Sequence, residues 1–327
     1  MKTTIDRVVV PLALIAGCTS GTSAPSKAYV GLFSSNEVAV VDTVNAMVLA
    51  TVEVPAPCGL VITPDGAKVY VSSNNSDVVD VIDTATDTIA SSISVGTQPA
   101  GLTIAPDGLS VVVSVQGDGQ AVILDTTTDA VTSKTAVGKA HNSAISVDGL
   151  TAYVASQVSA SPAVDVVAMR GAGAASSFTI DKSPRALAVL ATKLYVTVAG
   201  SDSIEVLDTA TGQAGAPIAT GGSPHDIRPT VDGTLLLTVS QTAGDLELID
   251  PGTQTVVAHI PTGAMPHWIA LSGDGKLAYV TNEGDNNLVV VDLVARAVIQ
   301  TIAVGTDPRK IAVAPLSPAP TPAAVQW

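Results

Sequence analysis

The chain has 327 residues, of which 46% are hydrophobic, 3% aromatic and 13% charged. With so few aromatic residues, its core has to be built from Val, Ile, Leu and Ala. The formal net charge of −14 makes a surface that repels phosphate backbones, which argues against nucleic-acid binding.

Residues 1–17 have the pattern of an export signal rather than of a structural element. Lys2 and Arg7 precede an apolar stretch, residues 8–17, that is too short to span a bilayer as a mature helix. We therefore expect this segment to be removed from the mature protein.

The apolar stretch ends in LIAGC, residues 14–18, which resembles the lipobox of bacterial lipoproteins. The resemblance implies a lipid on Cys18 and a bacterial cell-envelope location, with the lipid as the only membrane contact. Thr19, in place of an aspartate, implies the outer membrane, with the protein facing the periplasm or the surface. An ordinary secretion signal with an incidental cysteine is the alternative. Residues 18–27 are rich in Ser, Thr and Gly, which predicts a flexible tether.

An aspartate that ends a short apolar run recurs along the chain at intervals of 40 to 43 residues. The series consists of Asp42, Asp83, Asp125, Asp208, Asp250 and Asp292, with Ala168 in the corresponding place between the third and the fourth. Regularity at this length indicates propeller blades or another repeat architecture. The runs have the length and the Val and Ile content of strands, which excludes helical repeats.

The clearest repeat spans residues 266–305 and contains four short runs rich in Val, Ile and Tyr. The sequence GDG at residues 273–275 separates the first two runs. It is a strong hairpin signal, because glycine readily adopts the positive φ that a tight turn needs. Four such strands form an antiparallel meander with two apolar faces, so each repeat has to stack on copies of itself.

The two ends of the chain contain complementary parts of one further repeat. Its second, third and fourth strands are expected at residues 28–33, 37–41 and 48–54, and a surplus first strand is expected at residues 310–314. Counting repeats in this way predicts an all-β fold over residues 28–314. This fold is a single seven-bladed β-propeller with four-stranded antiparallel blades, and the N-terminal strands plus the C-terminal strand close its ring.

Three segments depart from the regular pattern. Residues 156–162 and 171–177 are loops of small residues, and we expect only a poor third strand between them. Residues 315–327 are proline-rich, which predicts a disordered tail.

The sequence YVTN occurs at residues 279–282, and relaxed forms of it occur at residues 70–73, 153–156 and 195–198. These motifs resemble the YVTN family of β-propeller repeats, and the resemblance covers residues 28–314. It implies the propeller fold, whereas it specifies function poorly because such folds host many uses.

The loops that lead into the first strand of most repeats have the form Gly-x-x-Pro. We expect the residue after the proline at the mouth of the central channel. Around the ring this position is occupied by Cys58, Ala100, His141, Arg185, His225, His267 and Arg309. Three of the four histidines thus fall on one ring. The fourth, His259, is expected in an outer strand as a plain surface residue.

We predict a ligand-binding site at this mouth, formed by His141, Arg185, His225, His267 and Arg309. Together with Lys310, these cationic and protonable side chains suit a small anionic ligand such as a carboxylate or a phosphate. The alternative is a purely structural role, in which Pro-His is simply a common sequence for this loop and each imidazole forms a hydrogen bond to the backbone.

A metal site is a second alternative, because imidazole and thiolate groups bind zinc and copper. Its ligands would be His141, His225, His267 and Cys58. Arg185 lies between two of these histidines around the ring, which argues against a tight metal cage. If Cys18 is lipidated, Cys58 has no second cysteine with which to form a disulfide.

Streptogramin lyases, which are also seven-bladed, resemble this chain in having a Pro-His at a first strand and a nearby glutamate. The matching residues here are Pro266, His267 and Glu283, although Asn282 occupies the place that the family pattern gives to the glutamate. Lactonase-type propellers resemble the chain in architecture but need a fuller set of carboxylates in the channel. We therefore expect a monomeric, non-catalytic scaffold for a small anionic ligand or an envelope protein partner, with a metal-dependent lyase or hydrolase as the alternative.

Overall fold

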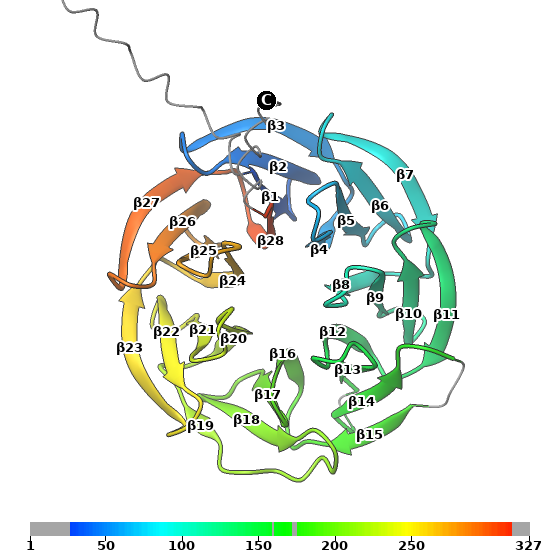
Figure 1. The fold of residues 1–327 in the computed structure, drawn as a ribbon, viewed down its shortest axis with the longest axis vertical. Coiled ribbons are helices and arrows are strands. Elements are labelled where there is room, and N and C mark those ends of the chain that lie inside the picture. The colour runs from blue at the N-terminus through cyan, green and yellow to red at the C-terminus, as the bar shows by residue number, and fades with distance from the viewer. Residues whose placement is uncertain (1–26, 159, 172–174, 316–327) are drawn as a thin grey trace, which may run out of the picture.

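The computed structural model describes residues 27–158, 160–171 and 175–315, which form seven β-sheets arranged in a ring around one axis (Figure 1). Each sheet has four antiparallel strands, and the described residues contain no helix, so none that is long and apolar enough to cross a bilayer. The predicted signal peptide, Cys18, and nearly all of the predicted tether and tail lie outside the described residues.

The strands are ordered from the axis outward in every sheet. The innermost strands are β4 (Pro57–Ile62), β8 (Pro99–Ile104), β12 (Ala140–Ile145), β16 (Pro184–Leu190), β20 (Pro224–Pro229), β24 (Pro266–Leu271) and β28 (Pro308–Val313). The second strands are β1 (Lys27–Leu32), β5 (Lys68–Ser73), β9 (Ser110–Val115), β13 (Thr151–Ser156), β17 (Lys193–Val198), β21 (Leu236–Ser240) and β25 (Leu277–Asn282).

The outer half of each blade contains the two remaining strands. The third strands are β2 (Glu37–Asp42), β6 (Val78–Asp83), β10 (Gln120–Asp125), β14 (Ala163–Ala168), β18 (Ser203–Asp208), β22 (Asp245–Asp250) and β26 (Asn287–Asp292). The outermost strands are β3 (Met47–Glu53), β7 (Thr88–Ser94), β11 (Ala130–Ala136), β15 (Ser176–Thr179), β19 (Ile218–Ala219), β23 (Thr255–Pro261) and β27 (Ala297–Ala303).

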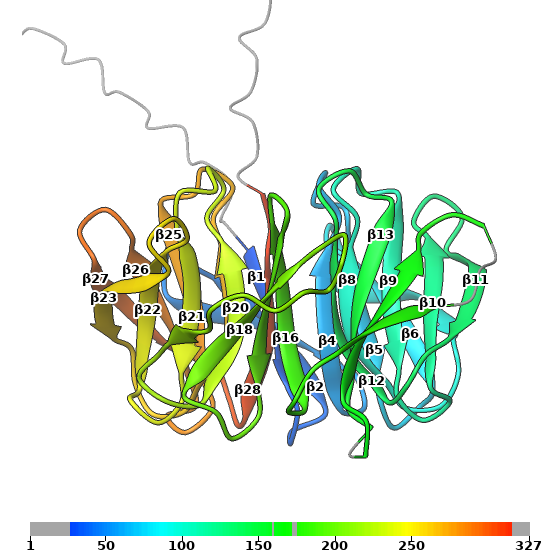
Figure 2. The same cartoon turned by 90° about the horizontal axis from the view of Figure 1, so that it is seen from below.

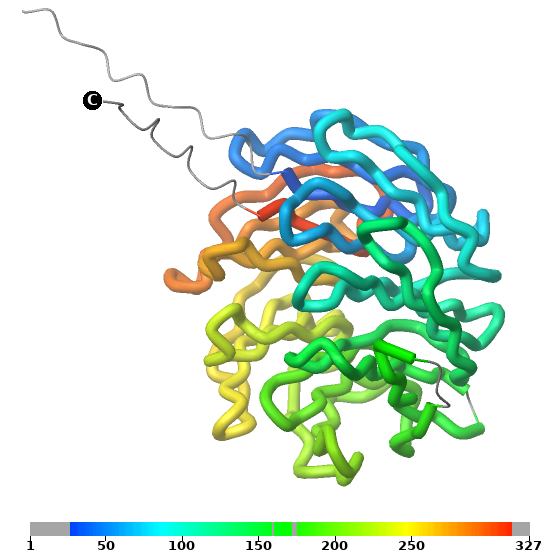
Figure 3. The backbone as a smooth tube through the Cα atoms, turned by 45° about the vertical axis from the view of Figure 1, so that its right-hand side comes forward, coloured from blue at the N-terminus to red at the C-terminus, as the bar shows by residue number. Residues whose placement is uncertain are grey.

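The ring is closed by one blade that both ends of the chain build. Strand β28 pairs antiparallel with β1, with Val313 opposite Ala28 and Ile311 opposite Val30 (Figure 3). This confirms the seven-bladed propeller and its closure by strands from both termini. The start of β1 and the end of β28 therefore lie on one face of the ring, and the inner strands begin on the other face (Figure 2).

The recurring aspartate holds the turn after the third strand. The Oδ1 atom of Asp83 accepts hydrogen bonds from the backbone N–H groups of Ala85 and Thr86, at 2.8 and 3.2 Å. Asp125, Asp208, Asp250 and Asp292 make the same two bonds to the residues that follow them. The side chain therefore closes a turn locally, which explains why the residue recurs once in nearly every blade.

One expectation about the irregular blade was wrong. Strand β14 is regular and pairs with β13 over six residues, because Val164 and Val167 are buried in the core between blades. The irregular strands are instead the outermost ones, β15 with four residues and β19 with two. Before β19, Gly215 and Pro217 interrupt the chain, and proline cannot donate a ladder hydrogen bond.

Candidate functional site

The seven positions predicted at the channel mouth are each the second residue of an inner strand. The inner strands surround the axis (Figure 1), so these positions lie around it on the face where those strands begin. At the start of β24 the pairing register shifts between Pro266 and Trp268, so His267 has no partner in the ladder. This bulge frees the peptide groups next to the histidine from the sheet.

In two of the blades, a threonine in the second strand bonds both to the bulge of its own blade and to the backbone of the neighbouring blade. The hydroxyl of Thr281 accepts a bond from Trp268 N (3.1 Å) and donates to Arg309 O (2.7 Å). In another blade, Thr197 accepts from Ala186 N and donates to His225 O, at 2.9 and 3.0 Å. The threonine thus fixes the backbone of a channel residue in the next blade.

Arg185, His225 and His267 form one contiguous group at the mouth. The Arg185 guanidinium donates to His225 Nε2 at 3.1 Å. Since a guanidinium only donates, Nε2 is an acceptor and Nδ1–H of His225 donates to His267 O at 3.1 Å. The two imidazole rings lie 4.1 Å apart. His225 therefore bonds to backbone, as a purely structural role predicts, whereas the buried Nδ1 of His267 has no partner.

Side chains from opposite sides of the ring meet across the channel. Lys310 on β28 donates from Nζ to Asn142 Oδ1 on β12 at 2.7 Å, and it lies over the ring of Trp268. The amide nitrogen of Asn142 in turn donates to Arg185 O and to His141 Nδ1, both at 2.8 Å. These hydrogen bonds link the blades that begin with β12, β16 and β28 into one polar network.

The acidic groups near this network are already paired with other arginines. The ion pairs are Arg228 with Asp226 at 3.2 Å, and Arg309 with Asp307 at 3.0 Å and Glu283 at 3.4 Å. Within the described ranges, no carboxylate lies at ion-pair distance from Arg185 or Lys310. The centre of the mouth therefore contains a guanidinium and a buried amine without a directly bonded carboxylate, and Asp226 acts on Lys310 only from a longer distance.

Burial keeps the histidines of the mouth neutral. It lowers the pKa of His141 to about 4 and the pKa values of His225 and His267 well below the ordinary range, and neighbouring cations add to the effect. Burial likewise lowers the pKa of Lys310 and raises that of the Cys58 thiol. At neutral pH these imidazoles are uncharged hydrogen-bonding groups.

The four residues predicted to bind zinc or copper do not form a tight ligand set. No three of Cys58, His141, His225 and His267 have their ligand atoms all within 4.8 Å of one another. A metal ion bound at the mouth would require these side chains to move together, and it stays a prediction.

The residues that resemble a lyase pair do approach each other. Nε2 of His267 lies 3.7 Å from Oε2 of Glu283. Burial raises the pKa of Glu283, which is also bonded to Asp307. An imidazole next to a carboxyl group with a raised pKa is an arrangement that can transfer protons.

The sequence analysis did not identify two buried polar residues next to the predicted positions at the mouth. Asn142 and Asp226 lie one residue beyond the predicted position and are 5% and 1% exposed. The position of each directly after a predicted histidine could have indicated them, because a bulge takes two consecutive residues out of the ladder. His259 lies exposed on the outermost strand β23, as expected, but the sequence did not reveal its two acidic neighbours: its Nδ1 lies 3.1 Å from Asp245 Oδ2 and 3.7 Å from Glu247 Oε1.

Two surface hollows lie away from the channel mouth. They are crevices of about 440 and 430 Å³, lined by turns on the face opposite the channel mouth. Lys193 and Gln254 line the first of them, and Lys68 and Asp107 line the second.

Comparisons with known proteins agree with the fold. The chain is similar to Kuenenia stuttgartiensis hydrazine synthase, with a TM-score of 0.70 and 20% identity over 80% of this chain and 91% of that one. A functionally unknown protein from Desulfotomaculum acetoxidans gives 0.75 and 14%, over 88% and 99%. A putative 6-phosphogluconolactonase from Bacteroides fragilis gives 0.72 and 15%, over 90% and 99%. Identities this low show the fold alone.

A search of the curated proteins found no match. The family model of the YNCE-like β-propeller matches residues 134–320, which is more than half of the chain. The chain therefore belongs to the YNCE-like β-propeller family.

Proposed function

We propose that this protein is a cell-envelope propeller that binds a small anionic ligand at the channel mouth and does not act as an enzyme. The observation that supports this most strongly is that the Arg185 guanidinium and the Lys310 amine both lie at the mouth, and that among the described residues neither has a carboxylate at ion-pair distance. Lys310 is only 6% exposed, and a cation this deeply buried is normally paired. Both cations lower the pKa of His225, so one anionic group near that ring would interact with both.

Ligand binding is expected to be coupled to proton uptake. Burial holds the pKa of Lys310 below its ordinary range, and an anion beside the amine would raise it again. His225 and His267 respond in the same direction, because an adjacent negative charge favours the imidazolium form. The affinity for an anion should therefore increase as the pH falls from about 8 to about 6.

The proposed lipid anchor leaves the mouth accessible. Strand β1 begins on the face opposite the one where the inner strands begin (Figure 2). A lipid on Cys18, connected through the tether to the start of β1, would hold that opposite face toward the membrane. The channel mouth would then face away from the bilayer, where a soluble ligand or an envelope protein partner can reach it.

Titration calorimetry on the full chain tests the binding proposal, with inorganic phosphate, acetate, succinate and citrate as probes. At least one anion should bind, more tightly at the lower pH, and Arg185→Ala and Lys310→Met should each weaken it by about tenfold or more. Lys276→Ala, in an exposed turn, is the matched control and should bind like the wild type. The proposal is wrong if no anion binds, or if both variants bind as well as the control.

Lipidation has a separate test. Expressed in a bacterium with its own leader, the wild type should enter the detergent phase in a Triton X-114 partition, and Cys18→Ala should remain in the aqueous phase. Equal partitioning of both would instead indicate an ordinary secretion signal.

A second candidate function, a hydrolase or lyase, is favoured by the approach of His267 to Glu283 at 3.7 Å. One of the similar structures is that of a putative 6-phosphogluconolactonase. Turnover of lactones or cyclic esters that disappears in His267→Ala, with an unchanged melting temperature, would establish catalysis and displace the binding scaffold.

A further inference from the structure

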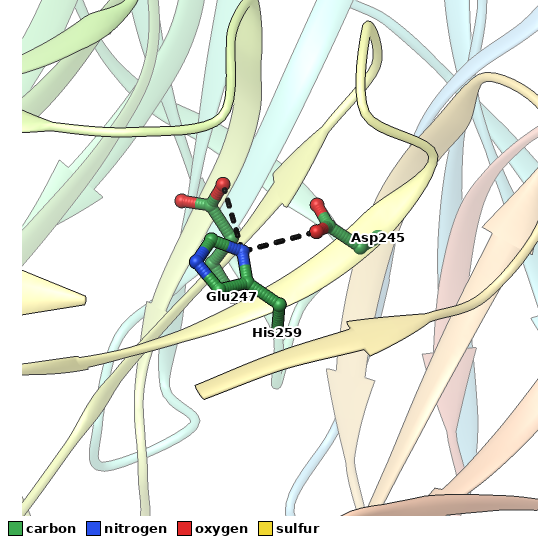
Figure 4. A group of neighbouring side chains, drawn as sticks. All are labelled: Asp245, Glu247 and His259. Carbon is green, nitrogen blue, oxygen red and sulfur yellow. Dashed lines mark hydrogen bonds and ion pairs between the residues drawn. The ribbon is translucent and has the colours of Figure 1, made fainter. Parts of the chain in front are cut away.

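A group of metal-ligating side chains lies in the outer half of one blade, away from the channel mouth. Asp245 and Glu247 are two residues apart on β22 and therefore project from the same face of the sheet. His259 on β23 is paired directly with Glu247 across the ladder, and the three side chains converge (Figure 4). Among the described residues, this is the only group of three His, Cys, Asp or Glu residues whose ligand atoms all lie within 4.8 Å of one another.

Both carboxylates of this group are buried and incompletely bonded. The side chain of Glu247 is fully buried; its Oε1 accepts from Gly221 N at 2.5 Å, and its Oε2 has no partner. Asp245 contacts His259 through Oδ2 at 3.1 Å, and its buried Oδ1 has no partner. Buried carboxylate oxygens without a donor are costly, so the arrangement calls for a further positive group.

Comparison with other blades shows what is unusual here. The place of Glu247 is taken by Asp80 in one blade and by Asp165 in another, and the residue paired across the ladder is a serine in both. Each serine hydroxyl donates to its aspartate at 2.5 Å and so satisfies the acid within the blade. In the blade of β22 the serine is replaced by His259. A second acid, Asp245, stands where the other two blades have Val78 and Ala163.

We propose that Asp245, Glu247 and His259 bind a divalent transition-metal ion. Metal–ligand bonds of about 2.0–2.2 Å in a tetrahedral zinc site imply separations of roughly 3.3–3.6 Å between ligand atoms. The separations from His259 Nδ1 to the two carboxylates, 3.1 and 3.7 Å, lie close to this range. An imidazole nitrogen with two carboxylates suits zinc and its first-row neighbours, whereas calcium and magnesium prefer an all-oxygen set.

The surroundings suit an ion that enters from solvent. The side chain of His259 is 55% exposed, whereas those of Asp245 and Glu247 are 11% and 0% exposed. The ion would lie at the boundary between the buried acids and water, with a coordination position left for a water molecule. Its charge would balance two carboxylates, and the bond from Gly221 N would orient one of them, as outer contacts do at metal sites.

The experiment uses the full chain stripped with chelator, desalted, and titrated with zinc chloride near neutral pH, with bound metal measured by mass spectrometry and affinity by calorimetry. We expect about one zinc ion per chain at this site. Loss of one of three ligands in Glu247→Gln or in His259→Ala should weaken it by more than about tenfold. His259 is half exposed, so His259→Ala is expected to fold even if substitution of the fully buried Glu247 prevents folding. The test can then rest on His259→Ala alone.

Two controls locate the ion. Asp165→Asn alters the matching acid in another blade and should leave zinc binding unchanged. The double variant His225→Ala/His267→Ala removes the histidines of the channel mouth and should also retain the zinc. Failure of the wild type to bind zinc, or retention of zinc in His259→Ala with loss in the double variant, would overturn the proposal. Neither result bears on anion binding by Arg185 and Lys310.

Discussion

At the scale of single residues, the threonine of the YVTN sequence has a role that the motif alone does not reveal. Thr281 is fully buried, and its hydroxyl bridges Trp268 N in its own blade and Arg309 O in the next. It therefore connects the repeat pattern directly to the placement of a channel residue.

Thr281→Val keeps the shape of the side chain and removes both hydrogen bonds. Two buried backbone groups then lack partners, so the free energy of unfolding should fall by about 2–3 kcal/mol, as measured by urea denaturation. Thr301→Val changes an exposed threonine on β27 and should leave stability within about 0.5 kcal/mol of the wild type. Equal effects of the two substitutions would contradict the role assigned to Thr281.

The buried histidines give the protein a defined acid sensitivity. Burial lowers the pKa of His141 from about 6.5 to about 4 in the folded chain, so the unfolded state binds the proton more readily. Stability is therefore retained above about pH 6.5 and falls between about pH 6.5 and 4, by up to about 1.4 kcal/mol per pH unit for each such histidine. Urea denaturation across this range should show a shallower slope for His141→Gln, and an identical slope would contradict the assignment.

At the scale of elements, the tyrosines of the second strands join neighbouring blades. The hydroxyl of Tyr70 on β5 donates to Asp129 at 2.5 Å, in the turn after β10, and Lys68 forms an ion pair with the same carboxylate at 2.8 Å. Tyr29, Lys27 and Asp87 repeat the arrangement one blade earlier. The lysine and tyrosine of the second strand therefore form contacts to the next blade in at least two of the repeats.

Tyr70→Phe should lower the free energy of unfolding by about 1–2 kcal/mol, because the hydroxyl bonds to a charged carboxylate. Tyr195→Phe is the control, since no hydrogen bond of the Tyr195 hydroxyl is seen within the described part of the chain; it should change stability by less than about 0.5 kcal/mol. Thermal and urea unfolding of both variants test this, and a larger effect at Tyr195 would show that the bond from Tyr70 to Asp129 does not stabilise the contact between blades.

At the scale of the whole molecule, closure depends on the last described strand. Ile311 and Ala312 of β28 are 3% and 6% exposed, and β28 covers the inner edge of β1. Without β28 the ring has an open blade with unpaired backbone groups at the axis.

Truncation after residue 307 should therefore abolish the cooperative thermal transition and promote aggregation, as seen by circular dichroism and size-exclusion chromatography. Truncation after residue 315 keeps β28 and serves as the control, with a melting temperature close to that of the full chain. A folded monomer after the shorter truncation would show that closure is dispensable.

The sequence by itself determined the strand content, the seven blades and their closure. The signals behind these features are local: an aspartate such as Asp83 closes its own turn, and alternating apolar residues define strands wherever they occur. It also placed His225, His267 and Arg185 on one ring, because equivalent positions of a repeat lie at equivalent places in the propeller.

Only the tertiary structure decided which of these side chains meet and which charges remain unpaired. Lys310 and Asn142 are 168 residues apart and touch across the channel. Arg309 pairs with Glu283, whereas Arg185 donates to His225. The group of Asp245, Glu247 and His259 depends on the register between two strands. Such contacts depend on distances of a few ångströms between distant residues, which a repeat pattern does not specify.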